Sequence, residues 1–164
     1  MSEPRRAETV FEGKQITVVR EEWERPREIV RHRGSTTIVP IHDGSLVLVD
    51  IFREPIRRRL VELPAGTLEE GEEPLASAQR ELEEEVGLKG GRWMTLGSYL
   101  TSPGFLDERM HVFLAEDLER GEQNLDAGEQ ITVVRWPVED IESRLADVDD
   151  LKTLAGLLLF LRRR

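Results

Sequence analysis

The sequence has no cysteine, a single tyrosine and only three histidines among its 164 residues. Without cysteine, disulfide bonds, thiolate nucleophiles and thiolate-bound metals are excluded. With so few imidazoles, any bound metal is expected to be a hard cation held by oxygen ligands. The sequence has no apolar run near the roughly 20 residues that span a bilayer, and no signal-peptide pattern at its N-terminus. We therefore expect a cytoplasmic protein with no membrane partner.

Positive charge is also scarce, because the formal net charge is −10 at pH 7. This excess of negative charge argues against general nucleic-acid binding. Lysine occurs only at Lys14, Lys89 and Lys152, so most of the positive charge is arginine. The planar fork of arginine suits phosphate groups, although a biased amino-acid usage explains the total count equally well.

The chain is long enough for one domain with a core of its own. Periodicity and turn signals predict strands at 9–12, 16–23, 27–34, 35–41, 46–52, 57–66, 93–103, 109–118 and 128–137. Asp43-Gly44 predicts a tight hairpin turn. Helices are expected at 74–86, 138–147 and 147–164. This pattern predicts an α/β fold, a layered sandwich with a mixed central sheet and an N-terminal antiparallel strand region.

The segment 63–88 carries eight glutamates and one basic residue, Arg80. On a helix from residue 74 to 86, four apolar positions form one stripe that is expected to face the core: Leu75, Ala78, Leu82 and Val86. Glu81 and Glu85 lie one turn apart beside this stripe, and Glu84 extends the same acidic edge. Like charges at this spacing destabilise a helix. Two interpretations are open, a solvated surface helix and a site for a hard divalent ion such as Mg²⁺.

The same segment resembles the Nudix box, Gly-x5-Glu-x7-Arg-Glu-U-x-Glu-Glu-x-Gly-U, in which U is an aliphatic residue. Every fixed position is filled in this sequence: Gly66, Glu72, Arg80, Glu81, Leu82, Glu84, Glu85, Gly87 and Leu88. The resemblance implies hydrolysis of a nucleoside diphosphate linked to another moiety, with Mg²⁺ or Mn²⁺ as the cofactor. Gly66 is expected to form a turn with positive φ, and Gly87 to end the helix.

The surroundings of the box resemble the ADP-ribose pyrophosphatase branch of this family. That branch has a proline about sixteen residues beyond the final glycine of the box, and Pro103 stands there. Members often have Arg-Gln-x-Arg before the box, whereas here only Arg53 matches. The resemblance therefore implies cleavage of ADP-ribose or a related nucleoside diphosphate sugar to AMP and a sugar phosphate. The alternatives are another substrate (GDP-mannose, FAD, NADH or a dinucleoside polyphosphate), a non-catalytic nucleotide-sensing domain, and an acidic interaction module.

The resemblance also implies roles for individual residues. Its metal ligands are Glu81, Glu85 and the carbonyl group of Ala65, with Glu84 as a further ligand or a group that holds water. Arg80 is expected to orient the glutamates of the box. Glu129 is the first candidate for the general base, and Glu108 is the alternative base or a substrate contact.

Substrate contacts are expected outside the box. Arg53 is the candidate for a phosphate contact or a contact with a dimer partner, and Glu62 for the substrate or the water shell of the metal. The loop Pro103-Gly104-Phe105 is expected to line the nucleotide pocket. The branch generally forms homodimers through N-terminal strands, so residues 1–36 are expected to serve dimerisation and residues 37–164 to form the Nudix hydrolase domain.

Overall fold

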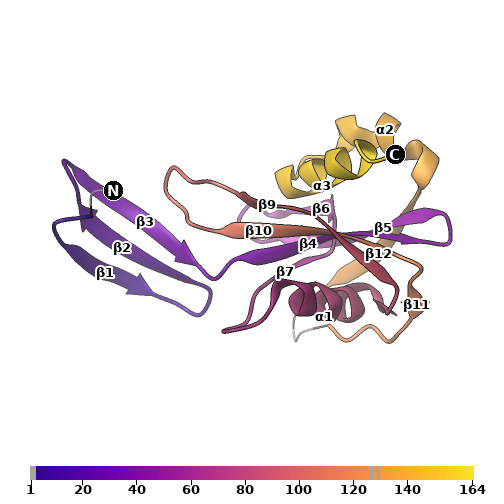
Figure 1. Cartoon of the computed structure of the whole chain (residues 1–164), viewed down its shortest axis with the longest axis horizontal. Coiled ribbons are helices and arrows are strands. Elements are labelled where there is room, and N and C mark those ends of the chain that lie inside the picture. The colour runs from indigo at the N-terminus through magenta and orange to yellow at the C-terminus, as the bar shows by residue number, and fades with distance from the viewer. Residues whose placement is uncertain (1–2, 126–127, 129) are drawn as a thin grey trace.

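The computed structural model describes residues 3–125, 128 and 130–164 (Figure 1). Its body is built on a seven-stranded sheet with the order β12-β5-β4-β10-β9, to which β6 adds beside β5 and β7 beside β4. Only the β4–β10 pair is parallel among these pairings, so the sheet is mixed. The strands are β4 (Ser35–His42), β5 (Ser45–Arg53), β6 (Arg58–Glu62), β7 (Ala65–Thr67), β9 (Arg92–Leu100), β10 (Arg109–Glu116) and β12 (Ile131–Pro137).

Helices cover both faces of this sheet, as Figure 1 shows, and this confirms the expected α/β/α sandwich. Helix α1 (Pro74–Val86) packs on one face, where Ala78 and Leu82 meet Ile38, Val47 and Phe113. The other face carries the remaining helices. These are α2 (Ile141–Arg144), α3 (Leu151–Leu161) and the 3₁₀ turns η1 (Val138–Asp140) and η2 (Leu145–Asp147). A two-stranded ribbon of β8 (Leu88–Lys89) and β11 (Glu119–Arg120) follows α1 at its C-terminal end.

The local sequence signals explain these boundaries. The β4–β5 hairpin closes at Asp43 and Gly44, whose φ angles of 50° and 71° are those of a tight turn with two left-handed residues. Pro74 starts α1, and Gly87 ends it with φ 66° while its N–H donates to the carbonyl of Glu83. The expected core stripe of α1 is correct except at its start, because Leu75 is 41% exposed in the first turn, before the helix meets the sheet.

Helix α3 packs unusually close to the sheet at Gly156. Its apolar side contributes Leu157 and Phe160 to the core, together with Trp136 and Ile141. A Cβ added at Gly156 would lie 2.5 Å from Cδ1 of Leu63. Since Leu63 is fully buried, it has no free space into which it can move.

Gly156→Ala is therefore expected to destabilise the protein despite the better helix propensity of alanine. Because the added Cβ would lie only 2.5 Å from Leu63, which is buried and cannot move aside, the overlap should cost about 2–3 kcal/mol. The propensity gain is about 1 kcal/mol, so the net effect is a loss of about 1–2 kcal/mol. Urea unfolding of the variant and the wild type measures it. Leu158→Ala, at a half-exposed position of the same helix, is the control and should change stability little. A Gly156→Ala variant as stable as the wild type would show that the packing is looser than described.

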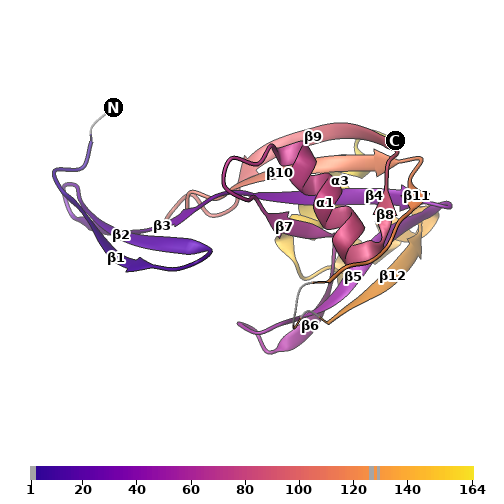
Figure 2. The same ribbon diagram turned by 90° about the horizontal axis from the view of Figure 1, so that it is seen from below.

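A separate three-stranded antiparallel sheet precedes the body. It consists of β1 (Ala7–Glu12), β2 (Ile16–Glu22) and β3 (Pro26–His32) in that order. Figures 1 and 2 both show it projecting from one end of the sandwich. It joins the body where β3 meets the loop before β10, since Val30 N–H donates to the carbonyl of Phe105 (2.7 Å) and Asp107 N–H to that of Val30 (3.2 Å). Among the described residues, no helix is both long and apolar enough to cross a membrane.

Candidate active site

The acidic edge of α1 lines a cleft of about 550 Å³. Strand β7 lines the same cleft with Ala65 and Gly66, and the end of β5 contributes Arg53. The turn between β1 and β2 adds Lys14 and Gln15, and Arg33 follows from the end of β3. The cleft thus brings together three carboxylates of the box and basic groups from three other segments, which is the charge pattern of a site for a metal ion and a phosphate.

Arg80 organises the carboxylates around the cleft. Its guanidinium donates to Glu72 through Nε and Nη2, both at 3.0 Å, and through Nη1 to Glu81 (2.8 Å) and Glu84 (2.9 Å). The hydrogen bonds to Glu72 and the charges of the neighbouring glutamates raise the pKa of Arg80, against partial burial, which lowers it. Arg80 therefore offsets part of the repulsion among Glu72, Glu81 and Glu84.

The Glu72–Arg80 pair makes stability depend on pH in a defined direction. The hydrogen bond from Arg80 lowers the pKa of Glu72 below its ordinary value of 4.5, although burial alone would raise it. A carboxylate with a depressed folded-state pKa stabilises the fold above its unfolded-state pKa, and this stabilisation is lost as the pH falls through the folded-state pKa. Glu72→Gln should therefore melt at a lower temperature than the wild type at pH 7 in metal-free buffer. The difference should shrink as the pH falls below 4.5. A difference that stays constant between pH 7 and 3 would contradict the role of this pair.

Glu85 and Glu81 face β7 at very short range. Glu85 is only 6% exposed, and its Oε2 accepts a hydrogen bond from the N–H of Ala65 at 3.0 Å. Glu81 lies directly against Gly66, because a Cβ built on this glycine would fall inside the carboxyl group of Glu81. Gly66 does not have the positive φ expected from the sequence. Its requirement is for space and not for a left-handed backbone, so that expectation was wrong.

The residues present suit a hard divalent cation. Carboxylate oxygens and a backbone carbonyl are the ligands that such ions prefer, and Gly66 leaves room for the Glu81 carboxylate beside the Ala65 peptide. Among the described residues, no three acidic or histidine side chains already stand as a complete set of metal ligands. Arg80 holds Glu81 and Glu84 in its own hydrogen bonds. Glu81, Glu84, Glu85 and the Ala65 carbonyl would hold the ion.

Arg53 and Glu62 form one unit at the end of β5. Arg53 donates from Nε to Oε1 (2.9 Å) and from Nη2 to Oε2 (2.7 Å) of Glu62, whose side chain is 1% exposed. Burial alone would raise the pKa of Glu62, but Arg53 and Lys152 lower it below its ordinary value. Arg53 lies in the lining of the acidic cleft. Glu62 contacts Arg53, and it lies beneath the described lining of the cleft.

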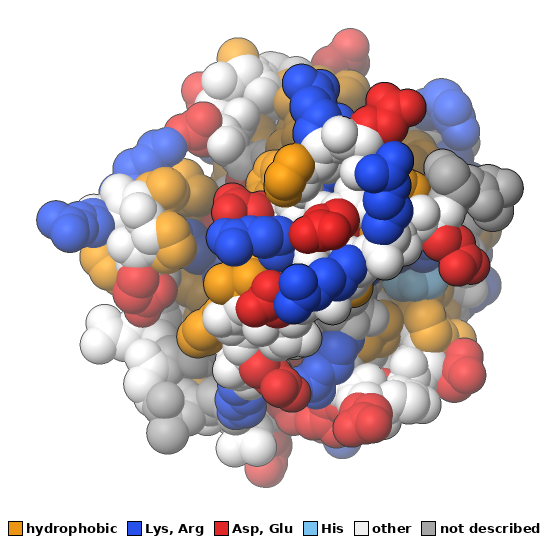
Figure 3. Space-filling view, turned by 90° about the vertical axis from the view of Figure 1, so that its left-hand side faces the viewer, with side chains coloured by type: hydrophobic (Ala, Val, Ile, Leu, Met, Phe, Trp, Pro, Cys, Tyr) orange, Lys and Arg blue, Asp and Glu red, His pale blue; other side chains and the backbone are white. Residues whose placement is uncertain are grey.

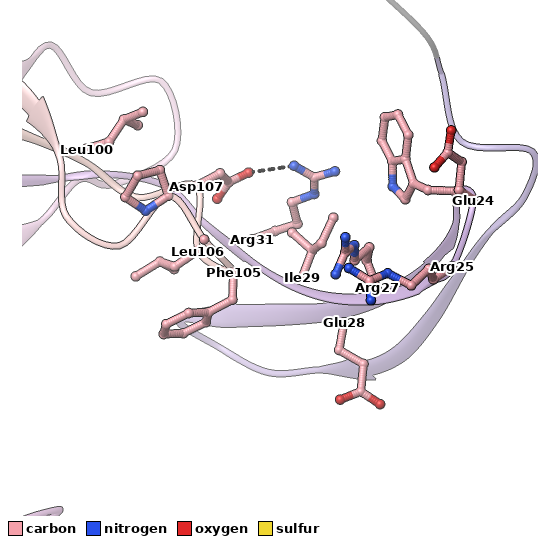
Figure 4. Close-up of a pocket in the computed structure, with 13 residues that line it drawn as sticks. Glu24, Arg25, Arg27, Glu28, Ile29, Arg31, Leu100, Phe105, Leu106 and Asp107 are labelled. Atoms are coloured by element: carbon pink, nitrogen blue, oxygen red, sulfur yellow. Dashed lines mark hydrogen bonds and ion pairs between the residues drawn. The ribbon is translucent and has the colours of Figure 1, made fainter.

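The other expected substrate residues lie at a second hollow. This hollow has a volume of about 660 Å³ and lies between β3 and the loop that carries Pro103, Gly104 and Phe105. Figure 4 shows side chains that line it, among them Arg31, Phe105 and Asp107. Trp23 forms another part of its wall, and its indole N–H donates to Glu21 at 2.9 Å. Arg31 crosses the hollow to Asp107 at 2.9 Å. This part of the expected site is therefore spatially distinct from the box.

The structure describes one of the two candidates for the general base. Glu108 accepts hydrogen bonds from the hydroxyl groups of Ser35 and Thr101, both at 2.7 Å, and does not belong to the described lining of the acidic cleft. Glu129 lies outside the described residues. The segment before it is anchored on α1, since Gln123 Nε2 donates to the Glu85 carbonyl (2.6 Å) and Asn124 N–H to that of Glu84 (3.0 Å).

Several residues of the cleft had no signal in the sequence. Lys14, Gln15, Arg33 and Asn124 come from turns and connections that lie far from the box in the chain. They reach the cleft because one end of the N-terminal sheet and the segment after β11 lie beside α1 in the folded protein. No local sequence pattern predicts either arrangement.

The sandwich fold and the arginine-bridged acidic edge define an α/β protein with a carboxylate-lined cleft. The NUDIX domain pattern matches residues 31–156. The chain therefore belongs to the NUDIX domain family, and it is a Nudix hydrolase. As such it works with a divalent metal ion.

Three relatives show how closely the chain follows known members. It is 43% identical over 159 residues to the ADP-ribose pyrophosphatase of Bacillus subtilis, covering 89% of this chain and 85% of that protein. It is 35% identical to the methanol dehydrogenase activator of Bacillus methanolicus, over 82% of this chain and 78% of that protein. The crystal structure of an ADP compounds hydrolase superposes with a TM-score of 0.85 at 25% identity, covering 98% of this chain and 92% of that one.

Proposed function

We propose that this protein hydrolyses the pyrophosphate bond of ADP-ribose or a related nucleoside diphosphate sugar and releases AMP and a sugar phosphate. The observation that carries the proposal is the complete box, whose three glutamates line one cleft against Ala65 and Gly66. The identity of 43% to an ADP-ribose pyrophosphatase supports the substrate class. The proposed cofactor is Mg²⁺, for which Mn²⁺ can substitute, and the proposed location is the cytoplasm.

In this proposal the box residues bind and orient the cofactor. Glu81, Glu85 and the Ala65 carbonyl are its ligands, and Glu84 is a further ligand or holds a water. When bound, such an ion would neutralise charge on the bridging phosphate and would make a water a better nucleophile. Arg80 orients the glutamates of the box through its hydrogen bonds to Glu72, Glu81 and Glu84. Glu129 is the proposed general base, with Glu108 as the alternative.

The substrate is proposed to span the two hollows. Arg53 faces the cleft with a guanidinium suited to a phosphate oxygen. Pro103, Gly104 and Phe105 are proposed to line the nucleotide pocket. Phe105 is 56% exposed, so its ring is accessible to a ligand.

A panel of nucleoside diphosphate derivatives assayed with Mg²⁺, with identification of the products, tests this function. The expected result is rapid formation of AMP from ADP-ribose and no turnover without a divalent ion. Preferred cleavage of GDP-mannose, FAD, NADH or a dinucleoside polyphosphate would keep the chemistry and replace the substrate. Absence of turnover on the whole panel, together with no thermal stabilisation by Mg²⁺, would contradict the proposal and favour an interaction module.

The proposal includes a homodimer formed through residues 1–36. The three-stranded sheet projects from the body, and Val10 and Phe11 on β1 are 51% and 54% exposed. Figure 3 looks onto this end of the molecule, where basic and acidic side chains lie intermixed with hydrophobic ones. Such a surface suits a partner of the same composition better than a strongly charged polymer. Light scattering should give the mass of two chains, and a monomer at all concentrations would refute this part.

A further inference from the structure

A chain of alternating charges connects the cleft to the first turn of α3. Lys152, on that turn, contacts Oε2 of Glu62, the same oxygen that accepts from Nη2 of Arg53. Its Nζ also donates to Oδ2 of Asp150 at 2.9 Å. Arg53, Glu62, Lys152 and Asp150 thus form a continuous row in which each ion lies beside ions of opposite sign. The row begins in the cleft and ends on the opposite face of the sheet.

The far end of this row is rigidly held. Asp150 is the N-cap of α3 and accepts from the N–H (2.9 Å) and the hydroxyl group (2.7 Å) of Thr153. The Thr153 hydroxyl oxygen in turn accepts from the N–H of Leu63 at 2.9 Å, and Thr153 is fully buried. The first turn of α3 and Leu63, the residue after Glu62, are therefore joined by a hydrogen bond. This bond holds the backbone of Lys152 in a fixed position close to Glu62.

Glu62 is buried, and for this reason its second cationic partner, Lys152, is important. A buried carboxylate needs compensation, and its two cationic partners share this task. If Arg53 alone compensated Glu62, its positive charge would be largely cancelled by that carboxylate. Because Lys152 also neutralises Glu62, the guanidinium keeps a net attraction for an anion in the cleft. Two of its N–H groups are fixed by Glu62, so the others are oriented in advance and lose little freedom on binding.

We infer that Lys152 is a positioning residue for substrate binding, which acts through Glu62 to orient Arg53 and preserve its charge for the diphosphate group. This inference rests on the proposed function only for the identity of the substrate. Lys152 itself is absent from the described lining of the cleft, so its effect on binding has to be transmitted by the two intervening side chains.

Lys152→Met removes the charge and keeps a side chain of similar length. We expect the KM for ADP-ribose to rise about five- to tenfold, as for the loss of one favourable charge interaction. The kcat should stay within about twofold, because an interaction made equally in ground and transition state affects binding alone. Lys152→Arg should restore the KM. Lys89→Met, which removes a lysine paired with Glu83 away from the cleft, is the matched control and should leave the KM unchanged.

A double-mutant cycle separates transmission through Arg53 from a general loss of structure. Arg53→Ala should raise the KM by itself, and adding Lys152→Met should raise it no further, since the lysine then has nothing to position. Thermal unfolding of each variant checks that all are folded at the assay temperature. Additive effects of the two substitutions, or an unchanged KM in Lys152→Met, would overturn the inference.

Calorimetric titration with ADP in metal-free buffer gives a readout that does not depend on turnover. Lys152→Met should bind ADP more weakly than the wild type by a factor similar to the change in KM. If the wild type binds ADP but does not cleave ADP-ribose, the proposed function is refuted. The inference about Lys152 is then decided by comparing the ADP affinities of the wild type and Lys152→Met. A wild type that cleaves ADP-ribose with a Lys152→Met variant of equal affinity would refute the inference alone. A wild type that neither binds ADP nor cleaves ADP-ribose would refute both.

Discussion

Glu85→Gln is expected to lose hydrolysis by about 10³-fold or more while the protein remains folded. The amide is of equal size, and its oxygen can still accept the hydrogen bond that the Ala65 N–H donates to Glu85 at 3.0 Å. What disappears is a negatively charged ligand proposed for the divalent ion, and electrostatic stabilisation of the kind that such an ion would supply to the reacting phosphate is worth about 10²–10³-fold per interaction. Steady-state assays with ADP-ribose and Mg²⁺, with thermal unfolding alongside, measure both parts of this expectation.

Glu83→Gln is the matched control on the same helix. Glu83 pairs with Lys89 at 3.3 Å and has a side chain that is 41% exposed, on the flank away from the cleft. It should keep wild-type turnover, because it removes the same charge from the same helix without touching the site. Full turnover in Glu85→Gln, or an equal loss in the control, would mean that the carboxylate of Glu85 has no specific role.

Gly66→Ala is expected to reduce hydrolysis by about 10²-fold. A methyl group at this position would occupy the place of the Glu81 carboxyl group. Its backbone is not in the left-handed region, so alanine fits the backbone itself. The carboxylate must therefore move, and a displacement of about 1 Å at a reacting centre can lower the rate by about 10²-fold. Assays of kcat with ADP-ribose measure this loss.

Gly44→Ala is the control for Gly66→Ala, and it is expected to affect stability instead of turnover. Gly44 has φ 71° and nothing within 4 Å of an added Cβ, and it lies in the β4–β5 turn. Alanine there should destabilise the fold by about 1 kcal/mol through backbone strain and leave turnover unchanged. If Gly66→Ala instead lost only stability and kept its activity, the close approach of Glu81 to β7 would have no part in catalysis.

The sequence predicted those features that local patterns encode. Periodicity, Pro74 and Gly87 gave the bounds of α1 as the structure has them, and Asp43-Gly44 located the hairpin. The acidic edge also followed from the sequence, because residues one turn apart on a helix necessarily share a face. The spacing of the box then identified the family.

Features that depend on tertiary contacts were not predictable in this way. Gly66 was assigned a positive φ, because no pattern in the chain shows that Glu81 occupies the space beside it. Leu75 has an apolar side chain typical of core residues, but it lies outside the contact between α1 and the sheet. Lys152 and Glu62 are 90 residues apart and meet only because α3 returns to β6. Contacts of this kind depend on the whole fold and have no signature in either segment alone.

In the function proposed for this protein, the acidic edge of α1 holds divalent ions against a pyrophosphate. Anomalous diffraction from crystals grown with Mn²⁺ and a non-hydrolysable ADP-ribose analogue tests it most directly. We expect Mn²⁺ bound by Glu81, Glu85 and the Ala65 carbonyl, with Glu81 and Glu84 released from Arg80. Anomalous density at other places only, with Arg80 still bridging Glu81 and Glu84 in the presence of the analogue, would contradict it.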